Sequence, residues 1–212
     1  MLRKLLLVSG ILSSLLYAAM MAVVARQWPG YSSASQTVSE LSAVGAPTQP
    51  LWSHLGAGYT VLVTAFGFGV WQSAERARAL RVTGGLVLVF GALGLLWPFA
   101  QMHPRDVLAA GGGTASDTMH LVLSGVTVLL MLLAIGFAAA AFGRPFRAYS
   151  IATLVVLLAC GVLTGLDAPA VSANLPTPWV GVWERINIGA FLLWIVVLSL
   201  VLLREPGGRR GV

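Results

Sequence analysis

Long runs of apolar residues, separated by short polar stretches, dominate the pattern of this chain. A helix that crosses the bilayer core needs about 20 mostly apolar residues. Six stretches qualify, over about residues 5–25, 51–73, 82–100, 118–142, 148–166 and 178–203. Because the bilayer core offers no water to backbone groups, and because these runs are too long for barrel strands, we expect six helices. The pattern predicts an all-α protein, with residues 1–212 forming one domain of six transmembrane helices.

Composition supports a membrane protein and excludes several other classes. Only 9% of the 212 residues are charged and 58% are apolar, whereas about 25% of an average soluble domain is charged. Twenty charged side chains are too few to cover a soluble globule of this size, which argues against a soluble enzyme and a disordered protein. Cys160 is the single cysteine, so the chain cannot form an internal disulfide.

The basic residues predict the orientation of the helices. The formal net charge is +6, which in a soluble protein would suggest a nucleic-acid partner. Ten of the thirteen bases, however, fall at one set of helix ends: Arg3, Lys4, Arg76, Arg78, Arg81, Arg144, Arg147, Arg204, Arg209 and Arg210. Because bases concentrate on the cytoplasmic side, we expect both termini in the cytoplasm and an inner-membrane location. The first apolar run is longer than that of a usual signal peptide, so we expect it to remain as a helix.

The acids and histidines gather in the opposite, extracytoplasmic half. Five of the seven acids and all three histidines are there: Glu40, Asp106, Asp117, Asp167, Glu184, His54, His103 and His120. The connections on that side, about residues 26–50, 101–117 and 167–177, are also the longer ones. Long loops that carry titratable groups are where function concentrates. We therefore expect the protein to work at its extracytoplasmic end.

Two carboxylates in these loops have both a structural and a functional interpretation. Thr37 with Glu40, and Thr114 with Asp117, have the spacing of a capping box, in which the pair closes the start of a helix. Asp117 also shares a helix face with His120, three residues later. The candidate catalytic residues are therefore His120, Asp117 and Glu40, each with helix capping or loop pinning as the plainer role.

The same residues allow a metal site or a proton-transfer site. Asp117 and His120, with His103 from the preceding loop, are candidate metal ligands, and zinc is the metal that such a set suggests. Without a metal, a histidine oriented by a carboxylate is a general base. The sequence contains no His-Glu-x-x-His motif, and no cofactor is predicted.

The third extracytoplasmic region adds charges at the boundary of the last apolar run. Thr177 followed by Pro178 is typical of a helix start. Glu184 and Arg185 then lie where the helix enters the membrane, as interfacial anchors or as inward-facing functional groups. The full set of candidate ligand-binding residues is Glu40, His103, Arg105, Asp117, His120, Glu184 and Arg185.

Four segments give the chain a family resemblance. They are Ser39-Glu-Leu-Ser-Ala-Val-Gly-Ala-Pro-Thr48, Met102-His-Pro-Arg105, Asp117-Thr-Met-His120 and Trp183-Glu-Arg-Ile-Asn187. With them the chain resembles, over nearly its whole length, a bacterial and archaeal membrane family known as domain of unknown function number 998. That family is similar to a larger DRAM/FRAG-like group of six-pass proteins, some of which are implicated in handling lipids or lipid anchors. The resemblance implies a fold and a membrane location, and no reaction.

Three functions remain open at this point. The first is binding or handling of a lipid headgroup in an outward-facing polar pocket, with membrane lipids as partners and no nucleic acid. The second is a metal-dependent membrane hydrolase that uses the outer histidine and aspartate cluster. Ser116, Asp117 and His120 resemble the Ser-x-x-x-His arrangement of ceramidase-like enzymes, although the later His-x-x-x-His pair of those enzymes is missing. The third, a small-solute or proton-coupled transporter, is disfavoured because the middles of the apolar runs carry almost no ionisable groups.

Overall fold

The computed structural model describes residues 1–75 and 77–204, and every regular element within those ranges is a helix. The long helices are α1 (Leu2–Val23), α2 (Gln49–Gln72), α3 (Arg78–Leu93), α5 (Ala115–Ala141), α6 (Arg144–Ser172) and α7 (Val180–Arg204). The short ones are α4 (Arg105–Ala109) and the 3-10 helices η1 (Ala25–Gln27), η2 (Ser39–Ser42) and η3 (Gly94–Phe99). The all-α prediction is therefore confirmed for the described residues.

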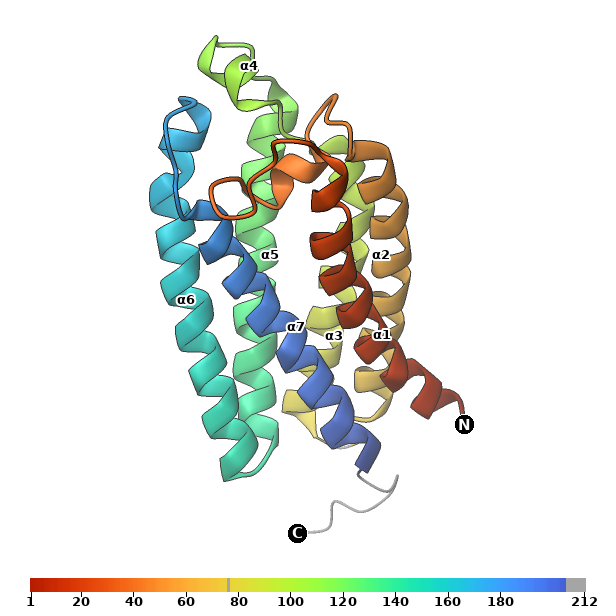
Figure 1. Ribbon diagram of the computed structural model, residues 1–212. Coiled ribbons are helices and arrows are strands. Elements are labelled where there is room, and N and C mark those ends of the chain that lie inside the picture. The colour runs from red at the N-terminus through yellow and green to blue at the C-terminus, as the bar shows by residue number, and fades with distance from the viewer. Residues whose placement is uncertain (76, 205–212) are drawn as a thin grey trace.

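The six long helices pack as a ring in chain order (Figure 1). Each contacts the helices before and after it, and α7 closes the ring against α1. Because the chain reverses direction at each step, α1 begins and α7 ends at the same end of the bundle. We call this the terminal end. The opposite end carries η1, η2 and α4 and is called the loop end.

Five of the described helical segments are long and apolar enough to cross a membrane: Leu2–Gln27, Arg78–Phe99, Ala115–Ala141, Arg144–Ser172 and Val180–Arg204. The helix α2 has sufficient length at 24 residues. Its four glycines, together with serine, histidine, tyrosine and threonine residues, lower its mean hydropathy. The structure thus supports a membrane protein with several apolar helices, and a sixth membrane span stays a prediction.

Two helices depart from the sequence prediction, each near a proline. The run predicted over 82–100 is α-helical only to Leu93 and continues as 3-10 helix η3. The ring of Pro98 conflicts with the carbonyl four residues earlier, at Gly94, which is where the α-helix ends. In α6 the helix instead passes through Pro169 to Ser172, so that residues 167–172 are helix where a loop was predicted.

The core lies between the helices and is built largely from aromatic and branched side chains. Trp194, in the middle of α7, is fully buried, and its indole nitrogen donates to the Ser150 hydroxyl of α6 at 3.2 Å. Its ring stacks on Phe191, which in turn contacts Phe90 of α3 from across the ring of helices. Trp194 therefore serves as packing inside the bundle and does not belong to an interfacial aromatic belt.

Glycines allow α2 and α3 to approach each other closely. A Cβ added to Gly84 would fall against the backbone of Trp71, and one added to Gly91 would contact the backbone of Thr64 at 3.0 Å. Small residues give this close approach in membranes, where packing contacts replace the hydrophobic effect between helices. The helix α3 therefore packs against α2 through its glycines.

Candidate functional site

The centre of the loop end is an ion pair between Arg105, the first residue of α4, and Glu40 in η2. The Nε and Nη2 atoms of Arg105 donate to the two carboxylate oxygens of Glu40, each at 2.8 Å. The side chains are 13% and 4% exposed, so this two-pronged pair is largely shielded from solvent. Arg105 also donates to the Thr177 hydroxyl at 2.8 Å and to the Ser35 carbonyl at 2.9 Å. One guanidinium thus joins all three loops of this end.

Glu40 is held in place by its own loop as well. The backbone N–H of Thr37 donates to the Glu40 carboxylate at 2.7 Å, and the Glu40 N–H donates to the Thr37 hydroxyl at 3.2 Å. These reciprocal bonds have the pattern of the predicted capping box, one residue before Val38, the N-cap of η2. The Thr37 hydroxyl and the Gln36 amide also donate to this carboxylate, each at 3.1 Å. With these donors and Arg105 around it, Glu40 has a structural part in closing the loop.

Glu184, in the first turns of α7, fixes the same loop from the other side. Its carboxylate accepts the backbone N–H of Val38 and, at 3.4 Å, the hydroxyl of Ser39. One turn earlier, the N–H of Gly181 donates to the Ala34 carbonyl at 2.9 Å. A side chain at Gly181 would collide with this loop, so a glycine there permits the loop to lie on the helix. The predicted boundary charge therefore faces inward and contacts protein.

Arg185 binds backbone carbonyls, and its only partners within the described residues are neutral. Its Nη1 donates to the carbonyls of Ser33 at 2.8 Å, Gln36 at 3.1 Å and Gly181 at 3.0 Å. Its Nη2 donates to the Tyr31 hydroxyl at 2.6 Å, and its guanidinium lies 5.6 Å from the centre of the Tyr31 ring. Arg185 therefore collects the oxygen atoms that the turning loop would otherwise leave unsatisfied.

Tyr31 is a member of this network that the sequence did not single out. Its hydroxyl accepts a hydrogen bond from Nη2 of Arg185 and donates one to the Thr37 carbonyl at 2.6 Å. Burial raises the pKa of Tyr31 to about 12, despite the neighbouring Arg185, so the hydroxyl keeps its proton at neutral pH. The role of Thr177 also differs from the prediction. The sequence predicted that the last helix starts at Thr177, whereas α7 begins at Val180. The Thr177 hydroxyl instead donates to the Ser35 carbonyl.

His103 and Asp117 form a second, more accessible pair. Asp117 Oδ2 lies 2.8 Å from His103 Nδ1, and Asp117 Oδ1 accepts the backbone N–H of His103 at 2.7 Å. Asp117 also accepts the N–H of Thr114 at 2.8 Å, and the predicted capping box at the start of α5 is present. The two side chains are 20% and 15% exposed. Asp117 therefore both caps a helix and orients an imidazole ring.

His120 lies apart from that pair. Its Nδ1 contacts the Ala100 carbonyl at 2.8 Å, and its buried ring packs edge-on against Trp97 at 5.3 Å. Because a carbonyl only accepts, Nδ1 carries the proton in this contact. The predicted contact between His120 and Asp117 along one helix face is thus not formed. Asp117, in the first turn of α5, instead contacts His103 in the segment before α4.

The seven candidate residues are divided among separate contacts. Arg105 with Glu40, Glu184 and Arg185 are engaged in fastening the loop 28–48, and His103 with Asp117 forms its own pair. Among the described residues, no three histidine, cysteine or acidic side chains are grouped as a metal would require. The chemistry this arrangement offers is that of an oriented imidazole at the surface of the loop end. No pattern in the sequence specified that Asp117 would contact His103, since this contact depends on how two segments meet in space.

A protein-family comparison matches residues 11–201, which cover α2, α3, α5 and α6 in full, parts of α1 and α7, and every residue of the loop-end contacts described above. That family is described as Protein of unknown function (DUF998). The chain belongs to it. The family resemblance inferred from the four sequence segments is confirmed. No curated protein and no solved structure matches the chain.

Proposed function

We propose that this DUF998 protein is a six-pass protein of the bacterial inner membrane, with both termini in the cytoplasm. Its function is to bind a lipid headgroup at the loop end, through His103 and Asp117. The observation that carries the proposal is the 2.8 Å contact between His103 Nδ1 and Asp117 Oδ2 on a partly exposed surface of a membrane bundle. Glu40, Arg105, Glu184 and Arg185 are instead occupied in fastening the loop 28–48.

The sixth span is α2, and packing supports this assignment. It lies between α1 and α3 in the ring and packs against both (Figure 1). The orientation is supported by the bases, because among those in the described residues only Arg26, Arg105 and Arg185 belong to the loop end. Of the ten bases predicted to be cytoplasmic, Arg76, Arg209 and Arg210 lie outside the described residues, and the other seven belong to the terminal end.

Labelling of introduced cysteines tests the orientation. In a Cys160→Ala background, Ser33→Cys and Ala173→Cys place thiols at exposed loop-end positions, and Lys4→Cys places one at the terminal end. An impermeant maleimide added to intact cells is expected to label the first two and to label Lys4→Cys only after permeabilisation. Labelling of Lys4→Cys alone in intact cells would show that the orientation is reversed.

The chemistry of the pair indicates which headgroup it prefers. With Nδ1–H donating to the ionised Asp117, Nε2 of a neutral His103 is an acceptor. The Asp117 carboxylate and the free Nε2 acceptor suit a headgroup that brings N–H or O–H donors. Ethanolamine has an ammonium group with three N–H donors, whereas choline has the same charge and none.

Lipid retention therefore tests the binding proposal. Protein purified in detergent and incubated with phosphatidylethanolamine or phosphatidylcholine is expected to retain the ethanolamine lipid several-fold better by native mass spectrometry. His103→Phe is expected to remove this preference. His54→Phe, at an exposed histidine of the same end whose ring contacts the Pro50 carbonyl, should leave it unchanged. Equal retention of both lipids by the unmodified protein would contradict the proposal.

A second candidate function, hydrolysis of the bound lipid, is favoured by the same contact. A carboxylate that accepts Nδ1–H holds the ring so that Nε2 can take a proton from water. Release of a headgroup or fatty acid during the incubations with phosphatidylethanolamine, lost in His103→Phe, would identify an enzyme. The Ser116–His120 pair considered from the sequence is less suited, because the Ser116 hydroxyl contacts Thr114 at 3.0 Å while His120 contacts Ala100.

A further inference from the structure

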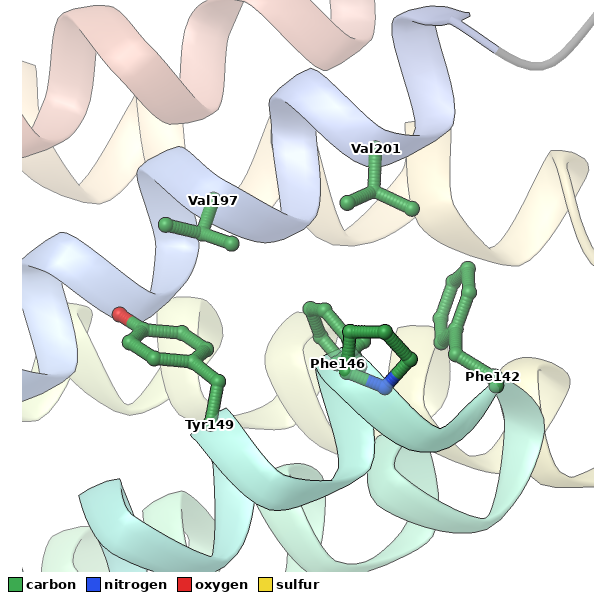
Figure 2. A pocket seen from close by; sticks show the side chains of 7 residues that line it. Phe142, Phe146, Tyr149, Val197 and Val201 are labelled. Atoms are coloured by element: carbon green, nitrogen blue, oxygen red, sulfur yellow. The ribbon is translucent and has the colours of Figure 1, made fainter.

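An apolar groove opens at the terminal end, far along the bundle from His103. Its volume is about 480 Å³, within the range of small-molecule sites. One wall is formed by the α5–α6 turn and the start of α6, and the other wall by the last turns of α7 (Figure 2). The lining residues are Phe142, Gly143, Pro145, Phe146, Tyr149, Val197 and Val201.

The walls of the groove suit a hydrocarbon chain. Val197 and Val201 of α7 face Phe142, Phe146 and Tyr149 (Figure 2). Three of these side chains are aromatic, and the rings of Phe142 and Phe146 lie 4.6 Å apart. Both flanking helices, α6 and α7, are apolar enough to cross a membrane, so lipid is the solvent around the groove. An acyl chain of the surrounding leaflet is the apolar group present there at the highest concentration.

The mouth of the groove is basic. Arg144 lies between two lining residues, Gly143 and Pro145, and its side chain is exposed. Within the described residues, neither Arg144 nor the neighbouring Arg147 takes part in an ion pair. The helix α6 also begins here, without a side-chain cap for its first N–H groups. A helix start with an arginine favours an anionic group such as a phosphate.

One polar atom is built into the apolar wall. The hydroxyl oxygen of Tyr149 is buried and makes no hydrogen bond of normal geometry to another described residue. Thr153, one turn along α6, directs its own hydroxyl to the Tyr149 carbonyl at 3.0 Å. A buried hydroxyl without a partner is unfavourable, because the hydrogen bonds it lost to water are not replaced. An ester oxygen of a lipid, located between the headgroup and the acyl chain, would supply that partner.

We propose that the groove binds an anionic glycerophospholipid, such as phosphatidylglycerol. One acyl chain lies between α6 and α7, an ester oxygen accepts from the Tyr149 hydroxyl, and the phosphate lies at Arg144 and the first turn of α6. This site goes beyond the proposed function, since it is at the other end of the bundle and uses neither His103 nor Asp117.

Native mass spectrometry of the full chain in detergent tests this site. The unmodified protein, incubated with phosphatidylglycerol or with phosphatidylcholine, is expected to retain one phosphatidylglycerol several-fold more than one phosphatidylcholine. Val201→Trp fills the groove and should reduce the retained phosphatidylglycerol at least several-fold. Leu200→Trp is the matched control, because Leu200 lies at the same depth of α7, is 40% exposed, and does not line the groove. It should retain the lipid.

Two further variants keep the test decisive if Val201→Trp does not fold. Arg144→Gln leaves the groove walls intact and should bring retention of the two lipids close together, and Tyr149→Phe should weaken retention of both. Unchanged phosphatidylglycerol retention in Arg144→Gln and Val201→Trp would overturn the proposal. The proposal would also be overturned if the unmodified protein bound no lipid and formed a dimer that Val201→Trp abolished. The groove would then be occupied by a second copy of the chain. His103→Phe should leave this retention unchanged, so that failure at either end is recognised separately.

Discussion

Replacing Arg105 with alanine is expected to lower the free energy of unfolding by about 3–5 kcal/mol, the range seen when one partner of a buried ion pair is removed. The side chain of Glu40 is 4% exposed and would be left buried without the guanidinium that pairs with it. The contacts of Arg105 to Thr177 and Ser35 would be lost as well. Unfolding of the purified protein in mixed micelles, followed by tryptophan fluorescence during titration with dodecyl sulfate, measures the loss.

Two comparisons separate the ion pair from a general effect of removing charge. Arg26→Ala removes an exposed base at the same end and should change the unfolding free energy by less than about 0.5 kcal/mol. The double variant Arg105→Ala with Glu40→Gln should lose less stability than the two single losses added together, because the residues interact directly. Additive losses would show that Arg105 and Glu40 act independently.

Gly84→Ala is expected to destabilise the protein by about 1–3 kcal/mol, as overpacking in a tight interior does. The added methyl group would fall against the backbone N and Cα atoms of Trp71, and a backbone cannot move aside as a flexible side chain can. The helices α2 and α3 would have to separate. The same titration measures this effect, and a lower apparent melting temperature should accompany it.

The neighbouring glycine supplies a matched control. A Cβ added to Gly85 meets nothing within 4 Å, so Gly85→Ala keeps the interface while making the same chemical change. Alanine is the better helix former, and this variant is expected to be neutral or slightly more stable. If both variants lose stability equally, the close contact between α2 and α3 is not the cause.

The helices were predictable because hydrophobic length is a local property. The predicted runs over 5–25 and 118–142 match α1 and α5 to within a few residues. Two helix boundaries were predicted wrongly, because an apolar pattern does not report backbone conformation. The predicted run over 82–100 becomes 3-10 helix η3 around Pro98, and α6 continues through Pro169. The short helix α4 was missed, since its five residues are too few for a periodic pattern.

The candidate site was predictable in its residue types and in its capping boxes. The pairs Thr37 with Glu40 and Thr114 with Asp117 are three residues apart, so their contacts follow from spacing alone. The partners of Arg105 and His103 are not local. Arg105 reaches Glu40 across 65 positions, and His103 meets Asp117 across 14.

By itself, the sequence determined an all-α protein with long apolar helices, its family, and the location of most acids and histidines in one half of the chain. Those properties follow from composition and local spacing. Only the tertiary structure decided which charges neutralise each other and where a groove remains. The reason is that ion pairs such as Arg105 with Glu40, and a cavity between α6 and α7, depend on how separate segments meet in space. His103 with Asp117 at the loop end and Arg144 at the terminal groove are the residues that we propose for ligand binding.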